Sequence, residues 1–285
     1  MIKKVDRKSM EIRESGRSTD FISPSFGFGC LLDCSYCYMK RHTNDNSLTI
    51  AKNTGQILSS INDHVMWLPE KQPNQTDRKY YTYDISCNED FALHYKHHNW
   101  KMIFDFFKNH DRVKASLATK IVPIEMLDYN PNKKVRIRFS LMPQSMSSIL
   151  EPNTPSIIDR VKAIDAFIDA GYEVHINFSP IIVHGKWLEE YRELFELVND
   201  YVDNKDEVLA ECIFLTHNEM KHVNNIAKGV KGEDMLWKPD LQETKQSQYG
   251  GVNLRYEVSK KRDYIQDFWK LHDEIIPWNT IRYIF

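Results

Sequence analysis

Residues 30–37 of this 285-residue chain read Cys30-Leu-Leu-Asp-Cys34-Ser-Tyr-Cys37 and contain three of its five cysteines. An odd total and such close spacing argue against a disulfide framework in a chain of this length. A structural zinc site needs four ligands, usually as two close pairs, whereas Cys87 and Cys212 are isolated. Three thiolates on one loop suit instead a [4Fe–4S] cluster in which one iron stays open to an exchangeable ligand.

Short strand-like runs alternate with longer helical patterns from about residue 20 to 216. Runs rich in β-branched or aromatic residues predict strands near 22–29, 79–86, 113–119, 134–141, 172–179 and 208–216. Apolar periodicity predicts helices at 47–62, 91–109, 155–170 and 186–201. The third helix is the clearest, because Ser156 and Asp159 form a capping-box pattern and Gly171 supplies a stop. Six β/α units in series imply a parallel sheet, either doubly wound or an incomplete barrel.

The pattern changes after residue 216. A polar stretch over 217–248 precedes a strand that ends at Tyr256, a helix around 259–275 and a last strand over 281–285. We therefore expect three segments. They are an N-terminal segment (1–19), the β/α part (20–216) and a C-terminal α+β extension (217–285) packed on it.

Charge and hydropathy exclude several classes of protein. The chain has 38 Lys and Arg against 40 Asp and Glu, a net charge of −2, which argues against a uniformly basic nucleic-acid coat but leaves a local basic groove open. No apolar run approaches the roughly 18 residues needed to cross a bilayer, and no apolar stretch follows the basic residues at the N-terminus. The sequence predicts a cytoplasmic protein with no membrane partner.

The C-x3-C-x2-C spacing, with Tyr36 directly before the last cysteine, resembles the radical S-adenosylmethionine (SAM) superfamily. This resemblance favours the barrel alternative and implies a partial (β/α)6 barrel with its cluster at the C-terminal ends of the strands. It implies a [4Fe–4S] cluster held by Cys30, Cys34 and Cys37. It also implies that SAM chelates the open iron and is split, on reduction by a donor such as flavodoxin or ferredoxin, to a hydrogen-abstracting 5′-deoxyadenosyl radical.

Further segments narrow the resemblance. In chain order they are 83–90, Ala118-Thr-Lys120, Ile137-Arg-Phe-Ser140, Leu150-Glu-Pro152, Phe178-Ser-Pro-Ile-Ile182, Glu243-Thr-Lys245 and 281–285. Together they resemble the spore photoproduct lyase family, which splits a methylene-bridged thymine dimer in DNA. The similarity covers nearly everything after residue 20.

This family resemblance implies catalytic roles for three residues. Cys87 stands where the family has a cysteine that gives a hydrogen atom to the thymine radical. Tyr36 and Tyr38 stand where two tyrosines help return hydrogen to the adenosyl radical. A thiol gives up hydrogen readily to a carbon radical, and Cys87 follows a predicted strand, where barrel active sites are built. The alternative that Cys87 is only a small buried residue stays open.

The resemblance also implies contacts to SAM at four strand ends, from Asp90, Lys120, Ser140 and Ser179. A cationic Lys120 would pair with the SAM carboxylate. Glu89 departs from the family, which has a smaller polar residue at this place.

DNA is expected to contact the C-terminal extension. Arg255, Tyr256 and Lys260 follow a Gly-Gly turn and would offer phosphate-binding cations beside an aromatic wedge, since a lesion must be flipped out of a duplex to reach a barrel mouth. A solvated helix face is the alternative for this basic run. His184, just after the fifth expected strand, either contacts substrate or packs. His94, His97 and His98 have a spacing that suits a metal, but a polar helix face is the favoured interpretation.

Three functions follow from these patterns. The first is a lyase of the spore photoproduct type that acts on DNA containing a thymine lesion. The second is a radical SAM isomerase or modifying enzyme that acts on a modified thymine, for instance in phage DNA. The third is an iron–sulfur protein that binds DNA or senses redox state without catalysis.

Overall fold

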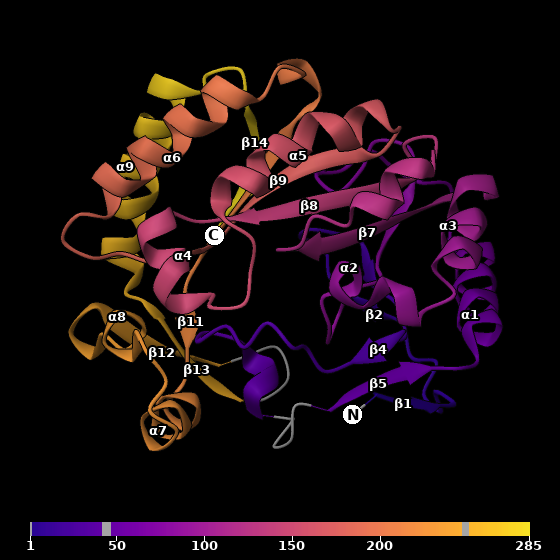
Figure 1. Ribbon diagram of the computed structural model, residues 1–285, viewed down its shortest axis with the longest axis horizontal. Helices are drawn as coiled ribbons and strands as arrows, with labels where there is room; N and C mark the ends of the chain where they lie inside the picture. The colour runs from indigo at the N-terminus through magenta and orange to yellow at the C-terminus, as the bar shows by residue number, and fades with distance from the viewer. Residues whose placement is uncertain (1, 42–46, 247–250) are drawn as a thin grey trace.

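The computed structural model describes residues 2–41, 47–246 and 251–285. Its main feature is an eight-stranded sheet that curls into a half-barrel, in the order β14-β10-β9-β8-β7-β6-β3-β2 (Figure 1). All neighbours are parallel except β2 and β3, so β3 and β6 to β10 confirm the predicted partial (β/α)6 barrel. The strands span Arg13–Glu14 (β2), Phe21–Ile22 (β3), Tyr81–Asp84 (β6), Val113–Thr119 (β7), Val135–Leu141 (β8), Glu173–Ile181 (β9), Leu209–Phe214 (β10) and Thr280–Ile284 (β14).

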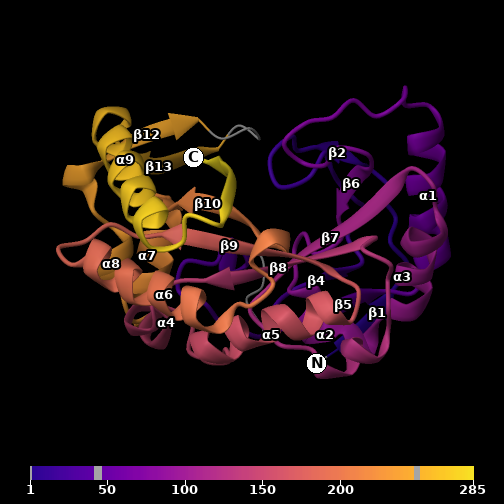
Figure 2. The same cartoon turned by 90° about the horizontal axis from the view of Figure 1, so that it is seen from above.

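Helices cover the outer side of this sheet, as Figure 2 shows for α2, α3 and α5. The α-helices around the sheet are α1 (Thr54–Met66), α2 (Phe91–His94), α3 (Trp100–Asn109), α4 (Gln144–Leu150), α5 (Ile157–Asp169), α6 (Trp187–Tyr201) and α9 (Val258–Ile275). Short 3₁₀ helices are η1 (Tyr38–Arg41), η2 (Tyr95–His97), η3 (Ile124–Asp128), η4 (Lys205–Glu207) and η5 (Pro239–Leu241). None of the described helices is long and apolar enough to span a bilayer.

Two small sheets flank the half-barrel. One joins β1 (Ile2–Val5), β5 (Leu48–Ala51) and β4 (Gly27–Phe28). The other joins β11 (Thr216–His217), β13 (Val252–Tyr256) and β12 (Gln242–Gln246), with α7 (Glu219–Ala227) and α8 (Glu233–Leu236) grouped beside it (Figure 1).

Strand β8 shows how the two faces of the curled sheet differ. Its residues alternate, so Phe139 points outward and meets Phe167 of α5, with ring centroids 5.5 Å apart. The residues between, Arg136, Arg138 and Ser140, have side-chain partners on other strands of the sheet. Apolar side chains therefore lie on the face of the sheet that the helices cover, and polar or charged side chains lie on the face that lines the interior of the half-barrel.

Those interior charges form two clusters of ion pairs. We call Asp77, Lys114, Arg136 and Glu173 the amino-end ion cluster, and Asp84, Arg138, Glu211 and Arg282 the middle ion cluster. In the first, Arg136 Nε lies 2.6 Å from Glu173 and Lys114 Nζ 2.7 Å from Asp77. In the second, Arg138 Nη2 lies 2.8 Å from Asp84, and Arg282 donates to Glu211. Buried charges are tolerated here because each has an opposite partner.

Several predicted elements match and several do not. The strand over 113–119 and the α5 helix with its Ser156 cap are confirmed, the Ser156 hydroxyl accepting from Asp159 N. The strand over 22–29 is wrong, because β3 and β4 enter different sheets. The helix over 47–62 is wrong at its start, since β5 precedes α1.

Two more differences concern longer segments. The helix over 91–109 is broken after η2, where His98 is extended. The polar stretch 217–248 contains α7, α8 and β12. The last strand does not stay within a C-terminal extension, because β14 pairs with β10 as part of the half-barrel.

Candidate active site

A cavity of about 450 Å³ opens at the carboxyl ends of the parallel strands. This is the end at which barrel enzymes build their sites. Ten of the residues selected from the sequence line it, namely Cys30, Cys34, Tyr36, Cys37, Tyr38, Cys87, Asp90, Lys120, Ser140 and Ser179.

The cysteine loop is shaped by its backbone. Gly29 has φ +109°, and a Cβ there would lie 2.4 Å from the Ser47 carbonyl oxygen, so glycine is required where the loop begins. A turn then joins Cys37 N to the Cys34 carbonyl at 3.0 Å, and Ser35 N donates to Leu150 O at 2.8 Å. This path brings the three thiols of the C-x3-C-x2-C motif to one cavity.

These thiols fit a [4Fe–4S] cluster as a donor set. All three cysteines are free, and burial raises the pKa of Cys30 and of Cys34 to about 12. The thiols of Cys30 and Cys34 therefore stay neutral in this pocket until a cation displaces their protons, as metal binding to cysteine does.

Cys87 lines the cavity from the loop after β6, and its thiol has two partners of its own. Arg13 Nη2 lies 3.5 Å from Cys87 Sγ, and the Tyr38 hydroxyl also bonds to this thiol. Burial, followed by the charge of Asp84, raises the pKa of Cys87 above its ordinary value, although Arg13 opposes the shift. Cys87 therefore carries its hydrogen at neutral pH.

The two tyrosines beside Cys37 differ in their contacts. The Tyr38 hydroxyl accepts from Asn88 N at 3.1 Å, next to Cys87. The Tyr36 hydroxyl donates to the buried carboxylate of Glu151, which also pairs with Arg160 at 2.8 Å. Only Tyr38 of this pair has a described contact with the Cys87 thiol.

The four strand-end residues are held in different ways. Asp90 accepts from Thr119 Oγ1 at 2.8 Å and from Lys120 N at 3.0 Å, and it caps α2 through Leu93 N. Ser140 Oγ accepts from Asn177 Nδ2 at 3.3 Å. Burial lowers the pKa of Lys120, but Glu151, Cys34 and Asp90 outweigh it, so this lysine is a cation in the cavity. Ser179, the fourth of these residues, lies near the carboxyl end of β9 and lines the cavity.

Glu89 explains two of the histidines. Its carboxylate is buried 2.9 Å from His98 Nε2 and 3.4 Å from His94 Nδ1, below Gly27, where a Cβ would lie 2.4 Å from Glu89 Oε2. The polar-helix-face interpretation is therefore wrong for His94 and His98, which are buried around this acid. His97 is exposed.

Four residues selected for substrate contact do not line the cavity. Tyr256 is fully buried and its hydroxyl accepts from Val183 N at 2.9 Å, so it is a core residue and not an aromatic wedge. His184 pairs with Glu190 at 2.7 Å. Arg255 Nη2 pairs with Glu243 at 2.8 Å, and Lys260 Nζ donates to Asp240 O at 2.9 Å.

Arg255 belongs to a group of cations that lies beside the cavity without lining it. Lys261 Nζ lies 5.8 Å from the ring centroid of Phe214, a cavity residue, and 5.3 Å from that of Phe285. Burial lowers the pKa of Lys261 to about 8, with further contributions from Lys245, Arg255 and Arg17. We call these four residues the basic cluster. Cations close enough to lower the pKa of Lys261 favour an anion beside them.

Sequence reasoning missed two residues of the site. Lys221 of α7 lines the cavity, and Arg13 of β2 contacts Cys87. Arg13 lies 74 positions from Cys87 and was seen only as one of several basic residues near the N-terminus. Lys221 lies in a polar stretch with no motif, so no signal in the sequence identifies it.

Comparisons with known proteins give a consistent result. A family model described as spore photoproduct lyase matches residues 4–285. The spore photoproduct lyase of Bacillus subtilis is 28% identical over 192 residues, which cover 67% of this chain and 54% of that enzyme. The chain thus spans about half the length of that relative. The spore photoproduct lyase of Clostridium acetobutylicum is 22% identical over 281 residues, covering 98% of this chain and 80% of that one.

Solved structures agree on the fold. A spore photoproduct lyase variant with bound AdoMet and dinucleoside spore photoproduct superimposes with a TM-score of 0.88 at 18% identity, covering all of this chain and 82% of that one. A spore photoproduct lyase complexed with dinucleoside spore photoproduct gives the same TM-score at 19% identity and the same coverage.

Proposed function

The chain belongs to the spore photoproduct lyase family, and we propose that it is a radical SAM enzyme that splits a methylene-bridged thymine dimer in DNA. The observation that carries the proposal is one cavity that holds both the three motif cysteines and Cys87. The names of the relatives and the ligands of the solved structures support the same substrate class.

Cys30, Cys34 and Cys37 would hold the cluster, and Asp90, Lys120, Ser140 and Ser179 would bind SAM. When bound, these groups supply a 5′-deoxyadenosyl radical that abstracts a hydrogen atom from the bridged thymine. Lys120 would pair with the SAM carboxylate, since its charge is maintained by the surrounding acidic groups. An electron donor such as flavodoxin or ferredoxin would reduce the cluster.

Cys87 would then restore a closed-shell thymine. Its S–H bond breaks homolytically, the hydrogen atom forms a C–H bond on the product radical, and the unpaired electron remains on sulfur. The raised pKa supports this role because a thiolate has no hydrogen to donate. Arg13 would position the sulfur from the side of β2.

Tyr38 would regenerate the thiol. Its O–H hydrogen passes to the sulfur radical, so an S–H bond forms and the unpaired electron moves to the phenol oxygen. The phenol O–H would be restored by a hydrogen atom from the methyl group of 5′-deoxyadenosine, which closes the cycle. The hydrogen bond between Tyr38 and Cys87 supports Tyr38 as this donor. Tyr36 would take part in the return of hydrogen only indirectly, because its bond to Glu151 would hold the loop around Cys37 in place.

DNA would lie across the basic cluster. Its four cations suit phosphates beside the cavity mouth, and their binding would place the flipped lesion over Cys87. Arg255 is the member of this cluster that the sequence had selected, whereas Lys260 and His184 would sit at most at the edge of the DNA. Free cysteines, five in the described residues, suit the reducing cytoplasm.

Anaerobic turnover tests the proposal. The cluster-loaded protein is mixed with SAM, reductant and a synthetic dinucleotide spore photoproduct, and products are identified by mass spectrometry. The proposal expects thymidylyl-thymidine in excess of 5′-deoxyadenosine, because hydrogen is returned in each coupled turnover. Formation of 5′-deoxyadenosine without repaired thymine would reject the lyase and favour a modifying enzyme. The absence of both products would reject radical SAM chemistry.

A further inference from the structure

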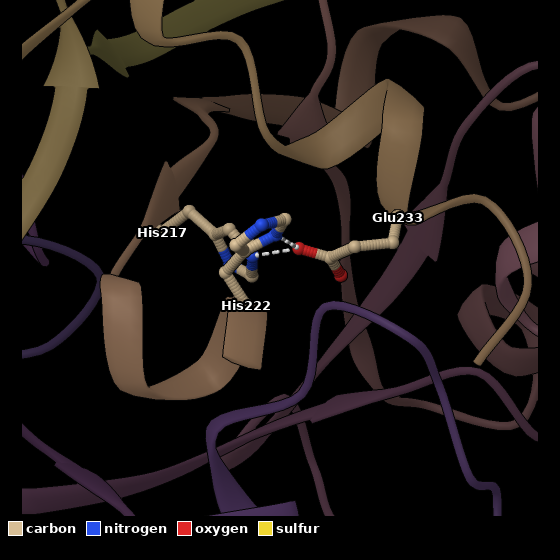
Figure 3. Close-up of side chains that lie close together, drawn as sticks. All are labelled: His217, His222 and Glu233. Carbon is tan, nitrogen blue, oxygen red and sulfur yellow. Dashed lines mark hydrogen bonds and ion pairs between the residues drawn. The ribbon is translucent and has the colours of Figure 1, made fainter. Parts of the chain in front are cut away.

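A second cluster of metal-binding side chains lies outside the cavity. His217, His222 and Glu233 point toward one another, as Figure 3 shows, and their ligand atoms all lie within 4.8 Å of one another. His217 Nε2 and His222 Nδ1 each lie 2.7 Å from the same carboxylate oxygen, Glu233 Oε1. His217 and Glu233 are buried, whereas a quarter of the His222 side chain is exposed.

The local fold fixes all three side chains. His217 ends β11, and Asn218 then caps α7 by accepting from Lys221 N at 2.8 Å, which turns His222 back toward the strand. Gly232 precedes Glu233 with φ +76°, and a Cβ there would lie 2.4 Å from Leu150 Cδ2. Glycine is therefore required at the turn that delivers the carboxylate.

The surrounding groups hold the ligands in orientation. Asn225 Nδ2 donates to the second oxygen, Glu233 Oε2, at 2.6 Å. The His222 ring stacks on Trp237, with centroids 4.2 Å apart and an interplanar angle of 10°. Metal ligands are typically oriented by such outer contacts.

We propose that His217, His222 and Glu233 bind one Zn²⁺ ion that braces the cysteine loop. Two imidazole nitrogens and one carboxylate oxygen form a ligand set that zinc uses with a fourth position left to water. Zn–N bonds of about 2.0–2.1 Å at tetrahedral angles separate neighbouring ligand atoms by roughly 3.3 Å, so small side-chain rotations from 2.7 Å admit the ion. The exposed edge of His222 gives the water position and an entry path.

The bracing role follows from the contacts of α7 and α8. Lys221 Nζ donates to Tyr36 O at 2.6 Å, and Asn225 Nδ2 donates to Ser35 O at 3.0 Å as well as to Glu233. Ser35 Oγ donates in turn to Lys231 O at 2.9 Å. The loop between Cys34 and Cys37 is therefore tied to α7 and to the turn before α8, and the zinc ion would join these two helices to β11.

Zinc content and zinc spectroscopy test the site. The cluster-loaded protein is equilibrated with one equivalent of Zn²⁺, desalted and measured for zinc and iron by mass spectrometry, then by zinc K-edge X-ray absorption. The proposal expects one zinc per chain with nitrogen and oxygen neighbours at about 2.0 Å and no sulfur shell at about 2.3 Å. A sulfur shell, or no retained zinc, would overturn it.

A matched pair of variants locates the ion. His222→Gln is expected to weaken zinc binding at least about tenfold, whereas His184→Gln, which alters a histidine–glutamate pair with the same 2.7 Å separation but no third ligand, retains it. Equal zinc retention in both variants would reject the assignment. If His222→Gln fails to fold, the absorption spectrum of the unaltered chain decides alone.

Iron release tests the bracing role separately. Transfer of iron to a chelator is expected to be several-fold faster in the zinc-free protein than in the zinc-loaded protein. Equal rates would reject bracing. Because these readouts need no substrate, failure of the zinc site and failure of the lyase proposal are distinguishable.

Discussion

The amino end and the carboxyl end of the half-barrel interior are built from the same strands but differ in what their polar groups contact. On β8, Arg136, Arg138 and Ser140 follow one another along one face. Arg136 at the amino end pairs with Glu173 and Asp77. The Ser140 hydroxyl at the carboxyl end lies in the cavity and accepts from the side-chain amide of Asn177 rather than from a charged group.

The amino end of the sheet therefore stabilises the fold, whereas the carboxyl end offers groups that can bind a ligand. A cavity of about 410 Å³ also lies at the amino end, but Arg136, Glu173 and Asp77, which line it, are paired with one another. At the carboxyl end, thiols, hydroxyls and Lys120 remain available to a ligand. The middle ion cluster lies between the two, and Arg138 and Asp84 form part of the cavity wall.

The largest effect is expected from a substitution that alters only the carboxyl end of the half-barrel. Cys34→Ala should abolish cluster binding and all SAM cleavage, because three thiolates are needed to hold the cluster. Its unfolding midpoint in the cluster-free state should stay near that of the unaltered chain. Iron content, 5′-deoxyadenosine yield and urea unfolding give the three readouts. Full iron loading in this variant would show that the loop is not the cluster site.

The second largest effect is expected from a substitution in the middle ion cluster. Glu211→Gln removes the buried carboxylate that Arg138 and Arg282 share, which leaves Arg138 paired with Asp84 alone and Arg282 without this acidic partner. The loss should cost about 3–5 kcal/mol of unfolding free energy. Urea unfolding of the cluster-free protein measures it. Glu274→Gln is the control, because Glu274 also pairs with an arginine but is exposed, and it should leave the midpoint unchanged. If Glu211→Gln and Glu274→Gln lower the unfolding free energy equally, the buried ion pairs do not stabilise the fold more than the exposed pair does.

Acid should reveal the same cluster in the unaltered chain. Burial raises the pKa of Glu211, but Arg138 and Arg282 outweigh it and bring the pKa to about 2, from an ordinary value of 4.5. Its contribution is therefore complete above pH 4.5 and is lost as the pH falls toward 2. The unfolding free energy should fall less steeply in this window for Glu211→Gln than for the unaltered chain. Parallel slopes would assign the acid sensitivity to other groups.

The sequence predicts those parts of this comparison that rest on local patterns, and it does not predict contacts between residues far apart in the chain. The cysteine motif and β7 are local patterns, so the spacing of the cysteines predicted the first and the composition of the run over 113–119 predicted the second. Alternation in β8 indicates a strand, but it does not tell whether the polar face meets water or a charged interior. The contact of Arg13 with Cys87 and the pairing of β14 with β10 join distant residues. Tyr256 was assigned to the surface because aromatic residues beside cations resemble a wedge, whereas the fold buries it.

A smaller effect separates the two tyrosines at the carboxyl end. Tyr38→Phe should slow turnover without changing stability, because it removes the hydroxyl beside Cys87. Tyr36→Phe should cost about 1.5–3 kcal/mol of unfolding free energy, because it removes a buried hydrogen bond to a carboxylate. Stopped-time product assays and urea unfolding distinguish them. Reversed effects would exchange the roles of these residues.

The smallest effect concerns the mouth of the cavity. Lys261→Gln should weaken binding of lesion-containing DNA and reduce the slope of log affinity against log salt by about 1, whereas Lys260→Gln should change neither. Fluorescence anisotropy at several salt concentrations measures both. Equal losses in the two variants would place the DNA on the outer face of α9.

The most direct test of the central claim is the product made by Cys87→Ala from a synthetic dinucleotide spore photoproduct with SAM and reductant. Mass spectrometry should show undiminished cleavage of the methylene bridge in the first turnover but little thymidylyl-thymidine, with most of the product carried away as adducts of the unquenched thymine radical. The same yield of thymidylyl-thymidine from Cys87→Ala and from the unaltered chain, with no adduct, would contradict the claim that the thiol at this end of the half-barrel returns the hydrogen.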